Sequence, residues 1–137
     1  MNTHLTTDDP STLLRRALVA NALFSGASGT VLALGARPVA SFLGVDAVLF
    51  LAVTGVLLIL YAADLLYVAT RPAINRTAAW MAVVLDLLWV AGSALILLGG
   101  WLPLTTGGQW AAAIVAELVF LFALFQYLGL RRLGDDS

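Results

Sequence analysis

The chain has 137 residues, of which 61% are hydrophobic and 11% are charged, and its formal charge at pH 7 is −1. Soluble domains are closer to half apolar and a quarter charged, so this composition indicates a membrane protein and gives no sign of a nucleic-acid partner. The absence of cysteine excludes disulfides, a thiol nucleophile and cysteine-bound metal, and the single histidine, His4, precedes the apolar sequence. We therefore expect no metal site and no cofactor.

Four apolar stretches follow one another along the chain, at about residues 18–36, 48–69, 78–98 and 110–130. Each has about the 20 residues that an α-helix needs to cross a hydrocarbon core of about 30 Å. The connections between them are short, which makes consecutive helices antiparallel neighbours. The sequence therefore predicts an all-α fold, in which residues 1–137 form a single transmembrane domain built as an antiparallel four-helix bundle.

Polar segments indicate where the helices begin and end. Ser11, directly after Pro10, is suited to cap a helix that starts before the first apolar stretch. In "TRPAINRT", between the second and third stretches, Pro72 ends the preceding helix because it has no backbone N–H and restricts the residue before it. "RPVASFLGVD" and "GGWLPLTTGGQW" are expected to be loops at the opposite side of the membrane.

The arginines predict the orientation of the chain. There is no lysine, and six of the seven arginines flank the apolar stretches on one side, with only Arg37 on the other. The six are Arg15, Arg16, Arg71, Arg76, Arg131 and Arg132. By the positive-inside rule, we expect a multi-pass protein of the cell membrane with both termini in the cytoplasm.

A faint internal repeat relates the first apolar stretch to the third. A shift of 65 positions pairs Ala17 with Ala82, Ser28 with Ser93, Gly35 with Gly100 and Pro38 with Pro103. Under the same shift, Asn21 meets Asp86 and Phe24 meets Trp89. Two repeated helical hairpins would explain the matches. Chance would explain several of them as well, because the sequence is rich in Leu and Ala.

Polar and aromatic side chains inside the stretches are the candidate functional residues. They are Asn21 in the first stretch, Tyr61 and Asp64 in the second, Asp86 and Trp89 in the third, and Glu117 in the fourth. An ionised carboxylate at the centre of a membrane helix costs about 2.5–3.5 kcal/mol on insertion scales. We therefore expect the three acids to face inward with Asn21, with Glu117 farthest from the cytoplasm. Gln126, nine positions after Glu117, points the opposite way.

These residues favour a protein that binds or carries a lipophilic small molecule, with proton translocation as a variant. The expected ligand-binding residues are Asn21, Tyr61, Asp64, Asp86, Trp89 and Glu117. One alternative is a membrane enzyme that acts on a lipid or isoprenoid, with Asp86 and Glu117 as general acid and base. Another is a structural or accessory subunit in which the acids only hold helices together. The expected partners are the membrane, a lipid or lipophilic molecule, and either a second copy or a membrane complex.

The sequence resembles the small, largely uncharacterised four-helix integral membrane proteins of bacteria. The likeness rests on "RR" before the first stretch, the four stretches themselves, the Asn, Ser and Gly residues of the first one, and "LDLLW" in the third. The resemblance implies a four-helix fold in a bacterial inner membrane. It implies no particular activity, because these motifs are not specific to one.

Overall fold

The computed structural model describes residues 9–100 and 102–135, and these residues form five helices and no strands. The helices are α2 (Thr12–Leu34), α3 (Ala36–Leu43), α4 (Val48–Thr70), α5 (Arg76–Gly99) and α6 (Thr106–Asp135). All of them except the short α3 are long and apolar enough to cross a membrane. The predicted all-α fold with four membrane-spanning helices is confirmed.

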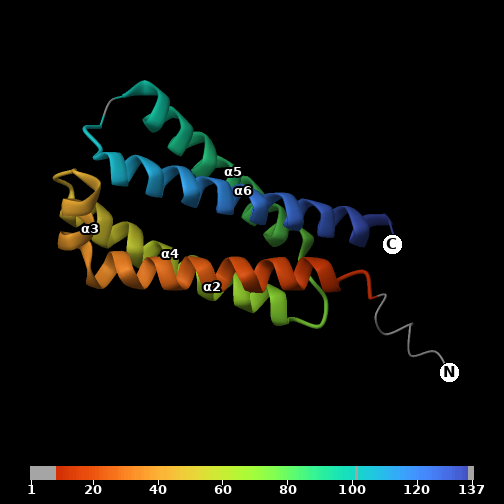
Figure 1. Ribbon diagram of the computed structural model, residues 1–137. Helices are drawn as coiled ribbons and strands as arrows, with labels where there is room; N and C mark the ends of the chain where they lie inside the picture. Colours follow the sequence, from red (N-terminus) through yellow and green to blue (C-terminus); the bar gives the residue numbers. More distant parts are fainter. Residues whose placement is uncertain (1–8, 101, 136–137) are drawn as a thin grey trace.

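Two differences from the predicted helix boundaries lie in α3 and α6. Helix α2 starts at Thr12, before the first apolar stretch, as expected, but α3 occupies a segment expected to be a loop, and α6 starts at Thr106, inside the second expected loop. Helix α3 is eight residues long, and it ends at Gly44, whose φ of 83° suits a residue without a side chain. It lies across the end of the bundle opposite the start of α2 (Figure 1).

Ser11 occupies the N-cap position of α2, but the expectation that its side chain caps the helix is wrong. The Ser11 hydroxyl donates to Asp9 Oδ1 at 2.8 Å and accepts from Arg15 Nε at 3.0 Å, so it bonds to no backbone N–H of the helix. The Ser11 backbone N–H also donates to Asp9 Oδ1, at 2.9 Å. The bond from the Ser11 backbone N–H, and to a smaller extent the bond from its hydroxyl, lower the pKa of the Asp9 carboxyl below its usual value of 3.8.

The other helix ends follow from local sequence chemistry. Arg71 is extended, with a ψ of 147°, as expected for a residue before proline, and α4 therefore ends at Thr70. The Asn75 side chain accepts from the Ala78 backbone N–H at 3.1 Å and caps the start of α5. Helix α5 ends at Gly100, whose φ is 65°.

The bundle consists of two hairpins. Helix α2 packs along α4, α5 packs along α6, and the two pairs meet mainly through α2 and α6, whereas α4 and α5 have few contacts (Figure 1). Within the first hairpin Gly29 and Gly55 let the backbones approach closely, because a Cβ on Gly55 would lie 2.6 Å from the Gly29 carbonyl oxygen. The Arg15 guanidinium joins the same two helices by donating to the carbonyls of Ala69, Arg71 and Pro72 at 2.6–2.9 Å.

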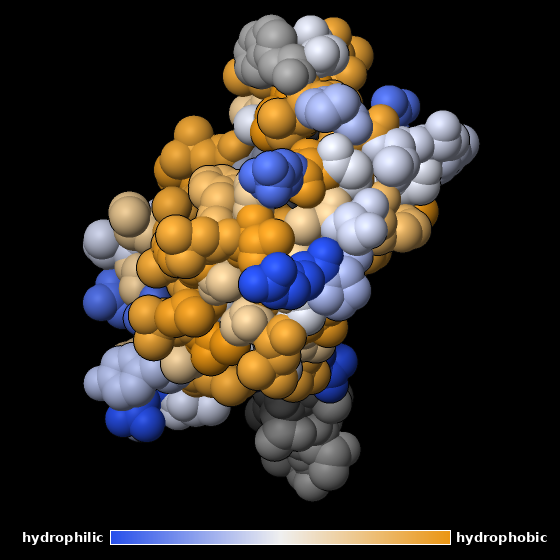
Figure 2. All heavy atoms as spheres, turned by 90° about the vertical axis from the view of Figure 1, so that its left-hand side faces the viewer, coloured by the Kyte–Doolittle hydropathy of each residue, from blue (hydrophilic) through white to orange (hydrophobic). Residues whose placement is uncertain are grey.

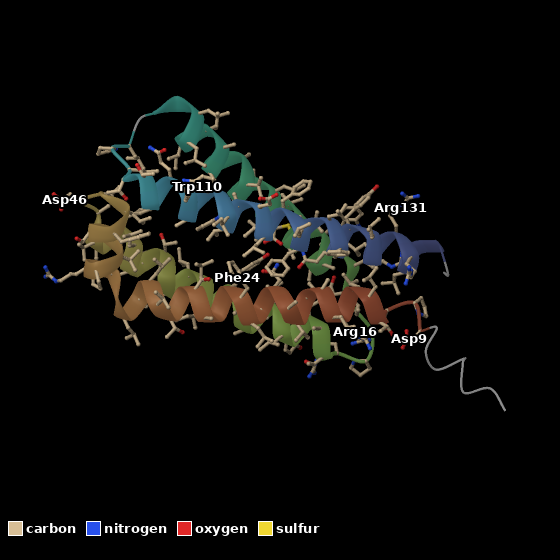
Figure 3. The ribbon with its side chains drawn as sticks, in the orientation of Figure 1. Asp9, Arg16, Phe24, Asp46, Trp110 and Arg131 are labelled. Atoms are coloured by element: carbon tan, nitrogen blue, oxygen red, sulfur yellow. The ribbon has the colours of Figure 1, made fainter. Side chains whose placement is uncertain are left out.

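The start of α2 and the end of α6 lie at the same end of the bundle (Figure 1), as four crossings of a membrane require. Asp9, Arg16 and Arg131 are at this end, and Asp46 is at the other (Figure 3). Large apolar side chains are exposed on all four long helices, for example Leu23, Leu57, Leu88 and Phe120. The view from the end that holds α3 is mostly hydrophobic, with hydrophilic residues in separate patches (Figure 2). The exposed apolar side chains along the four long helices suit contact with lipid.

Candidate functional site: a buried polar network around Asp86

Asp86 of α5 is buried where the four long helices meet, with 4% of its surface exposed. Its Oδ1 accepts a hydrogen bond from the Tyr61 hydroxyl of α4 at 3.0 Å. Its Oδ2 accepts from Asn21 Nδ2 of α2 at 2.8 Å and from Gln126 Nε2 of α6 at 3.0 Å. One carboxylate therefore joins all three of the other membrane-spanning helices.

Further bonds complete the network. Asn21 Nδ2 also donates to Gln126 Oε1 at 2.9 Å, and the Ser25 hydroxyl donates to Asn21 Oδ1 at 3.0 Å. The Tyr61 hydroxyl has a second acceptor, the Ala82 carbonyl oxygen, at 3.2 Å. In residues 9–100 and 102–135, every buried side-chain nitrogen and oxygen has a hydrogen-bond partner. The network is therefore satisfied as it stands.

Small residues one or two turns away bring these side chains within bonding distance. Ala79 and Ala82 precede Asp86 on the buried face of α5, and Ala123 and Gly129 flank Gln126 on the buried face of α6. A Cβ on Gly129 would lie 2.7 Å from Leu14 Cα, so α6 can approach α2 this closely only with glycine there. In a membrane, such small residues are what allows helix backbones to approach each other.

The chemistry of the network is that of an acceptor surrounded by neutral donors. An ionised carboxylate only accepts hydrogen bonds, and the three side chains that donate to Asp86 are two amides and a phenol. The arginines in the described part of the chain lie in or next to the ends of the long helices, or in α3. The arrangement can therefore hold one negative charge, one proton or one cation at Asp86.

The structure brings together three of the residues expected from the sequence and leaves three apart. Asn21, Tyr61 and Asp86 are members of the network. Trp89, one turn after Asp86, is 38% exposed and lies beside the network without bonding to it.

The expectation that all the acids face inward is wrong for Asp64 and Glu117, because both side chains are exposed. Glu117 lies on the face of α6 opposite Gln126, so Asp86 and Glu117 do not form the acid and base pair considered from the sequence. Asp64 follows Tyr61 by three positions, on a face of α4 that α5 leaves uncovered. The cost of a charge in lipid indicates that an acid should be covered, but it does not tell which helix face is packed.

Gln126 is the functional candidate that the sequence interpretation missed. The prediction that Glu117 faces inward turns Gln126, on the opposite side of the helix, away from the cluster, and this prediction is wrong. The buried neighbours Val119, Ala123 and Gly129, at spacings of seven, three and three, mark the Gln126 face as the packed one. This pattern of small residues was readable in the sequence.

Comparisons of the chain with models of protein families, with curated proteins and with solved structures find no match. The described residues also contain no group of three or more His, Cys, Asp or Glu side chains placed to hold a metal ion. The argument for function therefore rests on the geometry around Asp86.

Proposed function

We propose that this protein binds or carries a lipophilic cation within the membrane and that Asp86 exchanges the cation for a proton. The observation that supports the proposal is the Asp86 carboxylate, buried and bonded to neutral donors from three helices, with no basic side chain among them. A charge in this position is costly in a membrane, and a proton or a bound cation would each relieve that cost. The arginine distribution further supports cytoplasmic termini.

Tyr61 is the member of the network that can most easily give up its hydrogen bond to Asp86. A protonated carboxyl group carries an O–H donor that needs an acceptor, and of the three donor atoms around Asp86 only the Tyr61 hydroxyl can also accept. Tyr61 can do so without losing its hydrogen bond, because the Ala82 carbonyl is already 3.2 Å from its hydroxyl. A cation and a proton would therefore compete for the same carboxylate oxygens.

The second candidate is a structural or accessory subunit. Its support is the complete satisfaction of the buried polar atoms in the described residues, as expected of a network that only holds helices together. In that case, replacing Asp86 changes stability and no ligand binding is found.

The test is the binding of radiolabelled tetraphenylphosphonium to the full chain in detergent at pH 6 and pH 8. The wild type should bind more tightly at pH 8, because fewer protons compete for Asp86. Asp86→Asn should weaken binding at least about tenfold, since a hydrogen bond or contact to a charged group contributes about 1.5–3 kcal/mol. Glu117→Gln removes an exposed carboxylate on the opposite face of α6 and should bind like the wild type. Equal binding by wild type and Asp86→Asn would refute the proposal.

A further inference from the structure

The two hairpins of the structure correspond to each other under the shift of 65 positions. The shift moves α2 from Thr12–Leu34 onto residues 77–99, and α5 spans Arg76–Gly99. It also relates four of the five network residues in two pairs, because Asn21 falls on Asp86 and Tyr61 falls on Gln126, whereas Ser25 falls on Val90. The network therefore lies where the two hairpins meet, and each hairpin contributes two positions that the shift relates.

The two interfaces between the hairpins should be alike in such an arrangement, but only one is closely packed. Between α2 and α6, Gly129 lies against the Leu14 backbone, and the rings of Phe24 and Phe122 are 5.6 Å apart. Phe24 points from α2 into the space between the two hairpins (Figure 3). The interface between α2 and α6 is therefore closely packed at two places along the helices, at Gly129 and at the Phe24–Phe122 pair.

The interface between α4 and α5 carries different residues at the equivalent positions. Asp64 stands where the second hairpin has Gly129, so α4 presents a carboxylate in place of the glycine that lets α6 approach α2. Leu57 and Trp89 stand where Phe122 and Phe24 touch, and they are 60% and 38% exposed. Helix α5 leads away from α4 toward the end of the bundle that holds α3 (Figure 1), and the two helices have few contacts.

We propose that the lipophilic cation binds to the faces of α4 and α5 that carry Leu57, Asp64 and Trp89. From there, the cation reaches Asp86 from the lipid side of the bundle. The occupant follows from the chemistry of the faces: Leu57 and Trp89 offer apolar and aromatic surface, and Asp64 and Asp86 offer negative charge. Tyr61 precedes Asp64 by three positions on α4 and donates to Asp86, so it connects the exposed face of α4 to the network. This inference rests on the proposed function and adds the location of the site.

The experiment measures tetraphenylphosphonium binding to the full chain for two pairs of variants related by the repeat or by chemistry. Trp89→Leu is matched by Phe24→Leu, its equivalent on the closed interface, and Asp64→Asn is matched by Glu117→Gln, an exposed acid elsewhere. We expect Trp89→Leu and Asp64→Asn to weaken binding about fivefold to tenfold. The two controls should stay within about twofold of the wild type, and melting temperatures measured on the same samples show whether each variant is folded.

A second measurement does not depend on removing a binding residue. The chain has no cysteine, so Leu57→Cys introduces a single thiol on the α4 face, and Ile114→Cys introduces one on an exposed part of α6. Bound tetraphenylphosphonium should slow the alkylation of the first thiol at least about threefold and leave the second unchanged.

The outcomes separate the two proposals. If Asp86→Asn abolishes binding while Trp89→Leu and Asp64→Asn do not change it, and Leu57→Cys is not protected, the proposed function holds and this location is wrong. If the wild type binds no cation, both proposals fail. If the α4 and α5 faces retain a lipid or a partner helix that tetraphenylphosphonium does not displace, the location of the cation site is likewise refuted.

Discussion

Replacing Asp86 by Asn and by Ala should have clearly different effects on the stability of the bundle. In Asp86→Ala, Asn21 Nδ2 keeps its bond to Gln126 Oε1, and the Tyr61 hydroxyl keeps the Ala82 carbonyl. Gln126 Nε2 loses the one acceptor it has in the network. A buried donor without a partner costs about 1–3 kcal/mol, and the lost volume of the side chain adds to that cost.

Asp86→Asn keeps the shape and most of the bonds. The new amide oxygen can accept from Asn21 and Gln126, and the new N–H can donate to the Tyr61 oxygen once that hydroxyl turns to Ala82. Hydrogen bonds between membrane helices average about 0.6 kcal/mol, so we expect a loss of about 1 kcal/mol or less. The two variants should therefore differ by about 1–2 kcal/mol.

Reversible unfolding of the full chain by sodium dodecyl sulfate in mixed micelles, followed by far-UV circular dichroism, measures this difference. Glu117→Gln serves as the control, since its side chain bonds to none of the network residues. If Asp86→Asn destabilises the protein as much as Asp86→Ala, the negative charge itself holds the helices together, and the hydrogen-bond reasoning is wrong. If the prediction holds, a loss of ligand binding in Asp86→Asn cannot be attributed to unfolding.

Three further predictions concern the ends and packing of the helices. Arg15→Ala should cost about 1–2 kcal/mol in the same unfolding assay because it frees three carbonyls, whereas Arg16→Ala should cost less than about 0.5 kcal/mol. Gly55→Ala should cost about 1–3 kcal/mol by forcing α2 and α4 apart, whereas Gly92→Ala, where a Cβ meets nothing within 4 Å, should be neutral or stabilising. Asp9 should titrate below 3.8 by NMR, so its contribution to stability is complete above that pH and is lost as pH falls through the lowered pKa; a measured value of 3.8 or higher contradicts this.

The membrane-spanning helices were predictable because length and hydropathy alone define them. The four predicted stretches lie within or extend at most two residues beyond α2, α4, α5 and α6. Helix α3 was not predictable by that argument, since it is too short to span a membrane and is stabilised by contacts at the end of the bundle. One such contact is the bond from the Thr105 hydroxyl to the Phe42 carbonyl, at 2.6 Å.

The candidate site was predictable only in part. The high cost of burying a charge in lipid predicts that Asp86 is covered and bonded to the Asn21 amide or to tyrosine hydroxyls, and the structure has it bonded to Asn21 and Tyr61. The same reasoning failed for Asp64 and Glu117, because that cost does not identify the packed face of a helix. Small residues identify it, and on α6 they lie around Gln126.

The contact between Asn21 and Asp86 shows what two hairpins in one chain permit. Two identical hairpins that paired as separate chains would place two copies of the same residue against each other at this position. Two asparagines can bond to each other, whereas two aspartates repel unless they share a proton. When both hairpins belong to one chain, the two positions can differ, so one can carry an amide donor and the other an acid. One carboxylate held by an amide at the junction of two hairpins is thus an arrangement that a symmetric dimer of one hairpin lacks.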